Sequence, residues 1–128
     1  MINFEGFSLS QNLQNSLARM NFTAPTPIQV SSIPLALEGR DILGSAQTGT
    51  GKTAAFSIPL VELLSRSKQG SALVLTPTRE LANQVIAVII QLLGKSNPIK
   101  AACLIGGESM HKQLGQLKSR PRIIVGTP

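Results

Sequence analysis

A loop rich in glycine and threonine carries the strongest chemical signal in the sequence. It consists of Ala46, Gln47, Thr48, Gly49, Thr50, Gly51, Lys52 and Thr53. Glycines allow successive backbone N–H groups to converge on phosphate oxygens, and the N-terminus of a following helix adds its dipole. Lys52 can place a positive charge on the terminal phosphates, and the Thr53 hydroxyl can ligate Mg²⁺. These residues predict a phosphate-binding loop, and the alternative is an ordinary glycine-rich turn.

Gln29 has two possible roles when the sequence alone is considered. It stands three residues after Thr26, where it could complete a capping box at the start of a helix. Its side-chain amide also offers the donor and acceptor pair that the edge of adenine complements. The aromatic residues are open to two interpretations as well, since a Phe near a nucleotide loop can stack on a base or belong to the core. The chain has no Trp or Tyr, and its Phe residues are Phe4, Phe7, Phe22 and Phe56.

Basic side chains are concentrated in the second half of the chain. The sequence has 12 Lys and Arg against 6 Asp and Glu, a net charge of +6. Residues 1–64 hold three basic and four acidic side chains, whereas residues 65–128 hold nine basic and two acidic ones. Such an excess favours a polyanionic partner such as nucleic acid, and the alternative is a solvated basic surface.

Length and composition predict one folded domain. The chain has 128 residues, of which 42% are hydrophobic and 14% charged, and these values exclude a disordered chain. The longest apolar run, residues 85–90, is far shorter than the roughly 18 residues of a membrane span, so we expect no membrane partner. The single Cys103 cannot form an internal disulfide and fits a core position in a reducing compartment, which predicts a cytoplasmic location.

Hydrophobic spacing places the loop among alternating helices and strands. Leucines at positions 9, 13 and 17 predict a helix capped by Ser10, and Pro27 begins a second helix. Residues 41–45 are expected to form an extended strand that enters the phosphate loop, and helical spacing resumes after it. Strands are then expected at residues 72–75, 100–105 and 123–125, with helices at residues 79–93 and 108–119. This alternation predicts an α/β fold, in which a parallel sheet has helices on both faces.

Together these residues resemble the motifs of the DEAD-box family of ATP-dependent RNA helicases. Phe4 and Phe22, followed by Pro25-Thr26-Pro27-Ile28-Gln29, resemble the family's Q motif, with Asn21 where the family usually has Gly. Residues 46–53 resemble its first helicase motif, in which Ala is the usual first residue. The other matches, in the family's order, are Pro77-Thr78-Arg79-Glu80-Leu81-Ala82, then Gly106-Gly107 with Gln113, then Gly126-Thr127-Pro128.

The resemblance implies a RecA-like P-loop NTPase domain that is incomplete at its C-terminal end. Residues 1–128 would be its N-terminal part, with a Q-motif region at 1–38 and a P-loop core at 39–128. The acidic Asp-Glu-Ala-Asp signature and a second RecA-like helicase domain in cis would lie beyond Pro128. We therefore expect an ATP-dependent RNA helicase, present here as a front part that binds ATP without hydrolysing it alone. The alternative is a non-catalytic nucleotide- or RNA-binding module.

The same resemblance implies roles for individual residues. Phe4 would stack on adenine beside Phe22, and Gln29 would read the adenine edge. Residues 46–53 would hold the phosphates of ATP and its Mg²⁺, with Lys52 and Thr53 positioning them. The sugar-phosphate backbone of RNA would contact Pro77, Thr78, Arg79, Gly106, Gly107, Gln113 and Thr127. This placement agrees with the positive charge of the second half, and the local alternatives are a helix start at residues 78–80 and a tight turn at 106–107.

Overall fold

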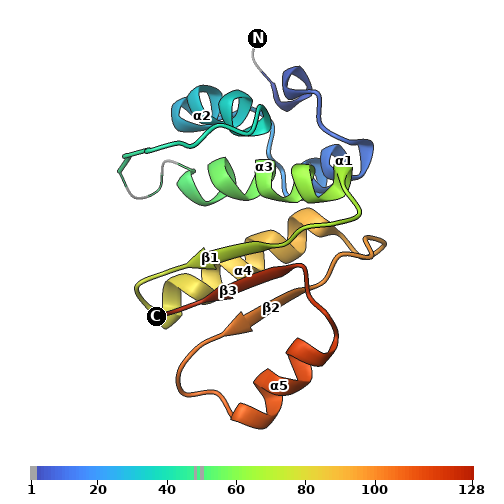
Figure 1. The fold of residues 1–128 in the computed structure, drawn as a ribbon. Coiled ribbons are helices and arrows are strands. Elements are labelled where there is room, and N and C mark those ends of the chain that lie inside the picture. The colour runs from blue at the N-terminus through green and yellow to red at the C-terminus, as the bar shows by residue number, and fades with distance from the viewer. Residues whose placement is uncertain (1–2, 48, 50) are drawn as a thin grey trace.

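The computed structural model describes residues 3–47, 49 and 51–128 (Figure 1). A short 3-10 helix, η1, spans Phe4–Phe7. The α-helices are α1 (Gln11–Arg19), α2 (Pro27–Leu37), α3 (Lys52–Arg66), α4 (Arg79–Leu93) and α5 (Met110–Lys118). The strands are β1 (Ala72–Leu75), β2 (Ala101–Leu104) and β3 (Ile123–Gly126). The helix predicted at residues 79–93 therefore has the expected bounds.

Helix ends follow capping signals in the sequence. The hydroxyl oxygens of Ser10, Thr78 and Ser109 accept hydrogen bonds from backbone N–H groups three residues later, at 3.4, 3.1 and 3.1 Å. Such bonds satisfy donors that the first turn of a helix cannot pair internally. Gly94 ends α4 with a φ of 76°, a conformation that glycine adopts without strain. The predicted Ser10 cap and Gly94 stop are confirmed.

The sheet is parallel and has the order β1-β3-β2. Leu73 of β1 and Ala102 of β2 both pair with Ile124 of β3. All three arrows in Figure 1 point to the side of the molecule where the C-terminus lies. The loops that follow the strands therefore gather at this carboxyl edge, and the loops that precede the strands gather at the opposite, amino edge. The predicted α/β fold with a parallel sheet is confirmed.

The hydrophobic core lies between the sheet and the helices. Ile123 and Val125 of the central strand are fully buried, as are Ile89 and Leu92 of α4, which packs against β2 and β3. The core continues through α3, where Ile58 is fully buried, to α1 and α2. Among the helices of the described residues, none combines the length and the apolarity needed to cross a bilayer.

Residues 41–45 differ from the sequence-based expectation. They connect α2 to α3 without strand pairing, and all of them are exposed, Leu43 completely. A strand needs a hydrogen-bonding partner, but β1 pairs only with β3, and the segment runs apart from the sheet in Figure 1. The strand expected before the phosphate loop is therefore not formed, and the sheet of the described residues has three strands rather than four.

Arg122 ties the loop before β1 to the start of β3. Its Nε donates to the Gly70 carbonyl at 2.9 Å and its Nη2 to the Gln69 carbonyl at 2.7 Å. Its Nη1 donates to the carbonyls of Leu64 and Ser67, both at 3.0 Å. One guanidinium group thus satisfies backbone acceptors at the end of α3 and along the whole loop to β1.

Arg122→Ala is expected to lower the free energy of unfolding by about 1.5–3 kcal/mol, because it leaves these carbonyls without a charged donor. Arg120→Ala is the matched control, since none of the described residues forms a hydrogen bond or ion pair with the Arg120 side chain. Its cost should stay within about 0.5 kcal/mol. Urea denaturation of both variants measures the difference, and equal losses would contradict the assignment.

Candidate nucleotide site and RNA track

The phosphate loop ends on the first turn of α3. Gly49 and Gly51 have φ values of 83° and 86°, which glycine accommodates without a Cβ clash. Gly51 is the N-cap of α3, and no side chain caps this helix. Its first N–H groups are therefore available to an anion, beside the exposed side chain of Lys52 and the half-exposed Thr53. Ala46 and Gln47 lie just before, whereas Thr48 and Thr50 fall outside the described residues.

Gln29 connects the start of α2 to this loop. Its Oε1 accepts the backbone N–H of Thr26 at 3.0 Å, so Gln29 does bond the helix start, as the capping interpretation predicts. Its Nε2 donates to the Gly51 carbonyl at 3.1 Å, a contact that the sequence did not reveal. The side chain is 3% exposed. An amide has two donors and two lone pairs, so these two bonds leave one of each unused.

Phe4 and Phe22 form an aromatic cluster rather than exposed platforms. Phe4 is 6% exposed, its ring stacks on Phe22 at 6.0 Å between centroids, and it meets Phe7 edge-on at 5.9 Å. Both Phe4 and Phe22 line a cavity of about 380 Å³ that neither Gln29 nor the phosphate loop lines. Asn21 has a φ of 60°, a left-handed conformation that Asn tolerates in place of Gly.

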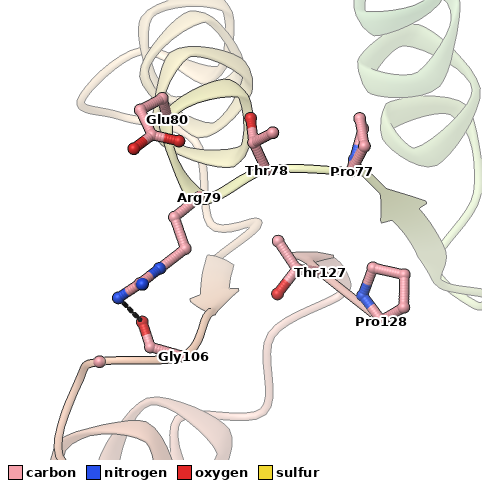
Figure 2. Close-up of a pocket in the computed structure, with 8 residues that line it drawn as sticks. Pro77, Thr78, Arg79, Glu80, Gly106, Thr127 and Pro128 are labelled. Carbon is pink, nitrogen blue, oxygen red and sulfur yellow. Dashed lines mark hydrogen bonds between the residues drawn. The ribbon is translucent and has the colours of Figure 1, made fainter.

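A second cavity, of about 520 Å³, lies at the carboxyl edge of the sheet (Figure 2). Its lining includes six of the seven residues that the family resemblance assigned to RNA, namely Pro77, Thr78, Arg79, Gly106, Gly107 and Thr127. Sequence reasoning missed Glu80 and Pro128, which are their immediate neighbours in the chain. The helix start at residues 78–80 and the turn at 106–107 are present as well, because Thr78 caps α4 and Gly107 has a turn conformation with a φ of 85°. We call this cavity the track.

Arg79 and Gln113 fix the Gly106-Gly107 turn that forms one wall of the track. The Arg79 Nη1 donates to the Gly106 carbonyl at 3.1 Å, as the dashed line in Figure 2 shows. A Cβ on Gly107 would collide with the same guanidinium group. Gln113 does not line the cavity, but its Nε2 donates to the Ile105 carbonyl at 2.9 Å and to the Glu108 carbonyl at 3.3 Å. Gln113 therefore holds the turn from outside the cavity.

The positive charge of the second half is not concentrated in the track. The cavity lining contains one basic side chain, Arg79, and one acidic side chain, Glu80. The charge count thus places the positive charge in residues 65–128, which hold all the residues that the resemblance assigns to RNA, but not in the track itself. The charge count covers all residues from 65 to 128, but only the loops after the strands reach the carboxyl edge.

The thiol of Cys103 is partly buried. Burial raises the pKa of its thiol, Glu108 raises it further, and Lys112 opposes these effects. Its partner is Asn83, whose Oδ1 lies 4.0 Å from the sulfur. Across residues 3–47, 49 and 51–128, no three His, Cys, Asp or Glu side chains gather where they could hold a metal ion.

Comparisons with known proteins agree with this geometry. The family model described as DEAD/DEAH box helicase matches residues 26–128. The DEAD-box ATP-dependent RNA helicase CshA of Bacillus subtilis is 47% identical over 128 residues, which cover 99% of this chain and 26% of that protein. RhpA of Helicobacter pylori, also a DEAD-box ATP-dependent RNA helicase, is 43% identical over 125 residues, covering 98% of this chain and 25% of that protein.

Solved structures show the same arrangement. A DEAD box protein from the hyperthermophile Methanococcus jannaschii has a TM-score of 0.90 and 43% identity, covering 100% of this chain and 35% of that one. An RNA helicase from Chaetomium thermophilum bound to ADP has a TM-score of 0.87 and 38% identity, covering 100% and 32%. The chain spans about a quarter of the length of the curated relatives it matches. On the family match and these likenesses, the chain belongs to the DEAD/DEAH box helicase family.

Proposed function

We propose that this chain is the ATP-binding front part of an ATP-dependent RNA helicase. The observation that carries the proposal is the hydrogen bond from the Gln29 amide to the Gly51 carbonyl. It joins the residue that would recognise adenine to the loop that would hold the phosphates. A base and a triphosphate bound to these two elements would therefore be held at a fixed separation.

The second half of the loop has defined tasks in this proposal. The N–H groups of residues 49–53 bind the β- and γ-phosphates, and Lys52 neutralises their charge. The Thr53 hydroxyl would help to hold Mg²⁺, which would supply positive charge to the phosphates. The uncapped N-terminus of α3 fits such an anion, because its donors have no side-chain partner. Phe4 would stack on adenine after leaving its contact with Phe22.

The track would bind the sugar-phosphate backbone of RNA. Arg79 neutralises a phosphate, the Thr78 and Thr127 hydroxyls donate to phosphate oxygens, and the Gly106-Gly107 turn allows close approach. These contacts read no base edges, so recognition is independent of sequence. Unwinding would also require a second helicase domain in the same polypeptide.

Gln29→Ala is expected to abolish the preference for ATP over GTP. The unmodified chain should bind ATP about 10- to 100-fold more tightly than GTP, because a paired donor and acceptor discriminate by about 1–3 kcal/mol. In the variant the ratio of the two affinities should approach one, and the loss of the Gln29–Gly51 hydrogen bond should weaken the binding of both nucleotides alike. Titration with fluorescent ATP and GTP analogues measures both affinities. Equal affinity of the unmodified chain for the two nucleotides would leave Gln29 as a helix cap only.

A further inference from the structure

A group of exposed cations lies at the amino edge of the sheet, on the side opposite the track. We call it the basic edge, and it consists of Lys68, Lys95, Lys100, Lys118 and Arg120. Lys68 is in the loop before β1, Lys95 and Lys100 are in the loop before β2, and the other two precede β3. In a parallel sheet these loops share one edge. The fold thus gathers cations that are dispersed in the sequence.

Backbone hydrogen bonds show that the three loops are contiguous. The Arg122 N–H donates to the Lys100 carbonyl at 3.0 Å, and the Ala72 N–H donates to the Arg122 carbonyl at 2.8 Å. Neighbouring strands lie about 4.8 Å apart, so the starts of all three fall within roughly 10 Å. The Arg122 side chain binds the loop before β1 and so fixes Lys68 near the others.

No acidic side chain neutralises the basic edge. None of its five side chains forms an ion pair with any of the described residues, and all five are exposed. The sequence has no Asp or Glu at residues 63–79, 81–107 or 109–128. Glu62, at the end of α3, is 2% exposed and already bonded to Arg66 and to the Ser10 N–H.

Helix dipoles account for only part of this charge. The C-termini of α3, α4 and α5 lie at the amino edge, and each is equivalent to about −0.5 of an elementary charge. Three helix ends therefore balance about 1.5 of the five positive charges. More than half of the positive charge of the basic edge therefore remains uncompensated. The helix ends alone do not require this many cations.

We propose that the basic edge is a second binding surface for the phosphate backbone of RNA, separate from the track. The choice of RNA as the polyanion rests on the proposed function. Strands of four residues separate the two edges by more than about 10 Å, so a phosphate at one edge cannot occupy the other. An RNA segment held at the basic edge lies outside the track and adds sequence-independent affinity.

The test is the salt dependence of binding to a 20-nucleotide single-stranded RNA of mixed sequence, measured with the 128-residue chain. The triple variant Lys95→Gln, Lys100→Gln and Lys118→Gln should reduce the slope of log K against log salt by about 2, because each single-strand contact contributes about 0.7. The corresponding Lys→Arg triple keeps the charges and should retain the slope. Melting curves of both variants verify the fold.

A second control separates local charge from net charge. Gln11→Glu, Asn15→Asp and Ala18→Glu alter exposed positions on α1 and lower the net charge by the same amount. Equal slopes for this control and the Lys→Gln triple would overturn the proposal, as would an unchanged slope for the Lys→Gln triple. Arg79→Ala tests the track alone and should lower the slope by about 0.7. A loss only with Arg79→Ala refutes the basic edge, and a loss only with the lysines refutes the track.

Discussion

Replacing Gly51 by alanine is expected to weaken ATP binding by about 100-fold while the domain stays folded. Gly51 has a φ of 86°, a conformation that costs an L-residue about 1–2 kcal/mol. The added Cβ would also collide with the buried Gln29 amide and lie 2.9 Å from the Thr26 Oγ1. Displacing Gln29 breaks two hydrogen bonds of about 0.5–1.5 kcal/mol each. The loop would relax away from its binding conformation, and ATP binding would have to restore it.

Gly39→Ala isolates the backbone contribution. Gly39 has nearly the same φ, 84°, but a Cβ added there would meet no atom within 4 Å, and the residue lies outside the phosphate loop. This control should lose stability without losing ATP affinity. In the double variant Gly51→Ala and Gln29→Ala the collision with the amide is removed, so affinity for a nucleotide triphosphate should recover in part. Isothermal titration of the unmodified chain, the two single variants and the double variant measures these ATP affinities. An unchanged ATP affinity in Gly51→Ala would refute the described loop geometry.

The second large effect concerns turnover, because the 128-residue chain is expected to bind ATP without hydrolysing it. Phosphoryl transfer needs a carboxylate to hold Mg²⁺ and a group to orient the attacking water. Glu38 pairs with Arg40, Glu108 pairs with Lys112, and Glu62 is buried in its contacts with Arg66 and Ser10. Glu80 lines the track instead. Four of the six acidic side chains of this chain therefore have other places or partners.

Phosphate release with saturating RNA measures this second prediction. An arginine that stabilises the transferred phosphoryl group contributes roughly 10³ to 10⁵ in rate, and the resemblance assigns such residues to the second helicase domain. Release should consequently equal that of the Lys52→Ala variant, which controls for contaminating ATPase. Release clearly above this control would mean that one of the chain's own glutamates performs the metal-binding task.

The sequence predicted those features that depend on neighbouring residues. The Ser10 cap, the bounds of α4 and the Gly94 stop were all predictable, because capping and hydrophobic period act within a few residues. The motif at residues 77–79 likewise indicated one wall of the track. The capping role of Gln29 was one of two interpretations, and the structure confirms it without excluding the other.

Features that depend on topology could not be predicted in the same way. The contact between Gln29 and Gly51 joins two separate elements, and no periodicity indicates it. Residues 41–45 were expected to form a strand from their place before the phosphate loop, but strand formation depends on which strand lies beside them. The charge count predicted that the net charge is positive and that the basic side chains lie in the second half of the chain. The strand directions determine at which edge of the sheet these side chains lie.

The central position of β3 has a consequence for biosynthesis. Within the part of the chain that the structure describes, β1 and β2 each pair with β3 and not with one another, so this three-stranded sheet cannot assemble until Gly126 has left the ribosome. At roughly 5–20 residues per second, β1 then waits for several seconds with its backbone unpaired. Leu73 and Leu75, which remain mostly exposed even in the folded sheet, are accessible throughout that interval. The nascent polypeptide therefore presents a natural target for chaperones that hold apolar segments during translation.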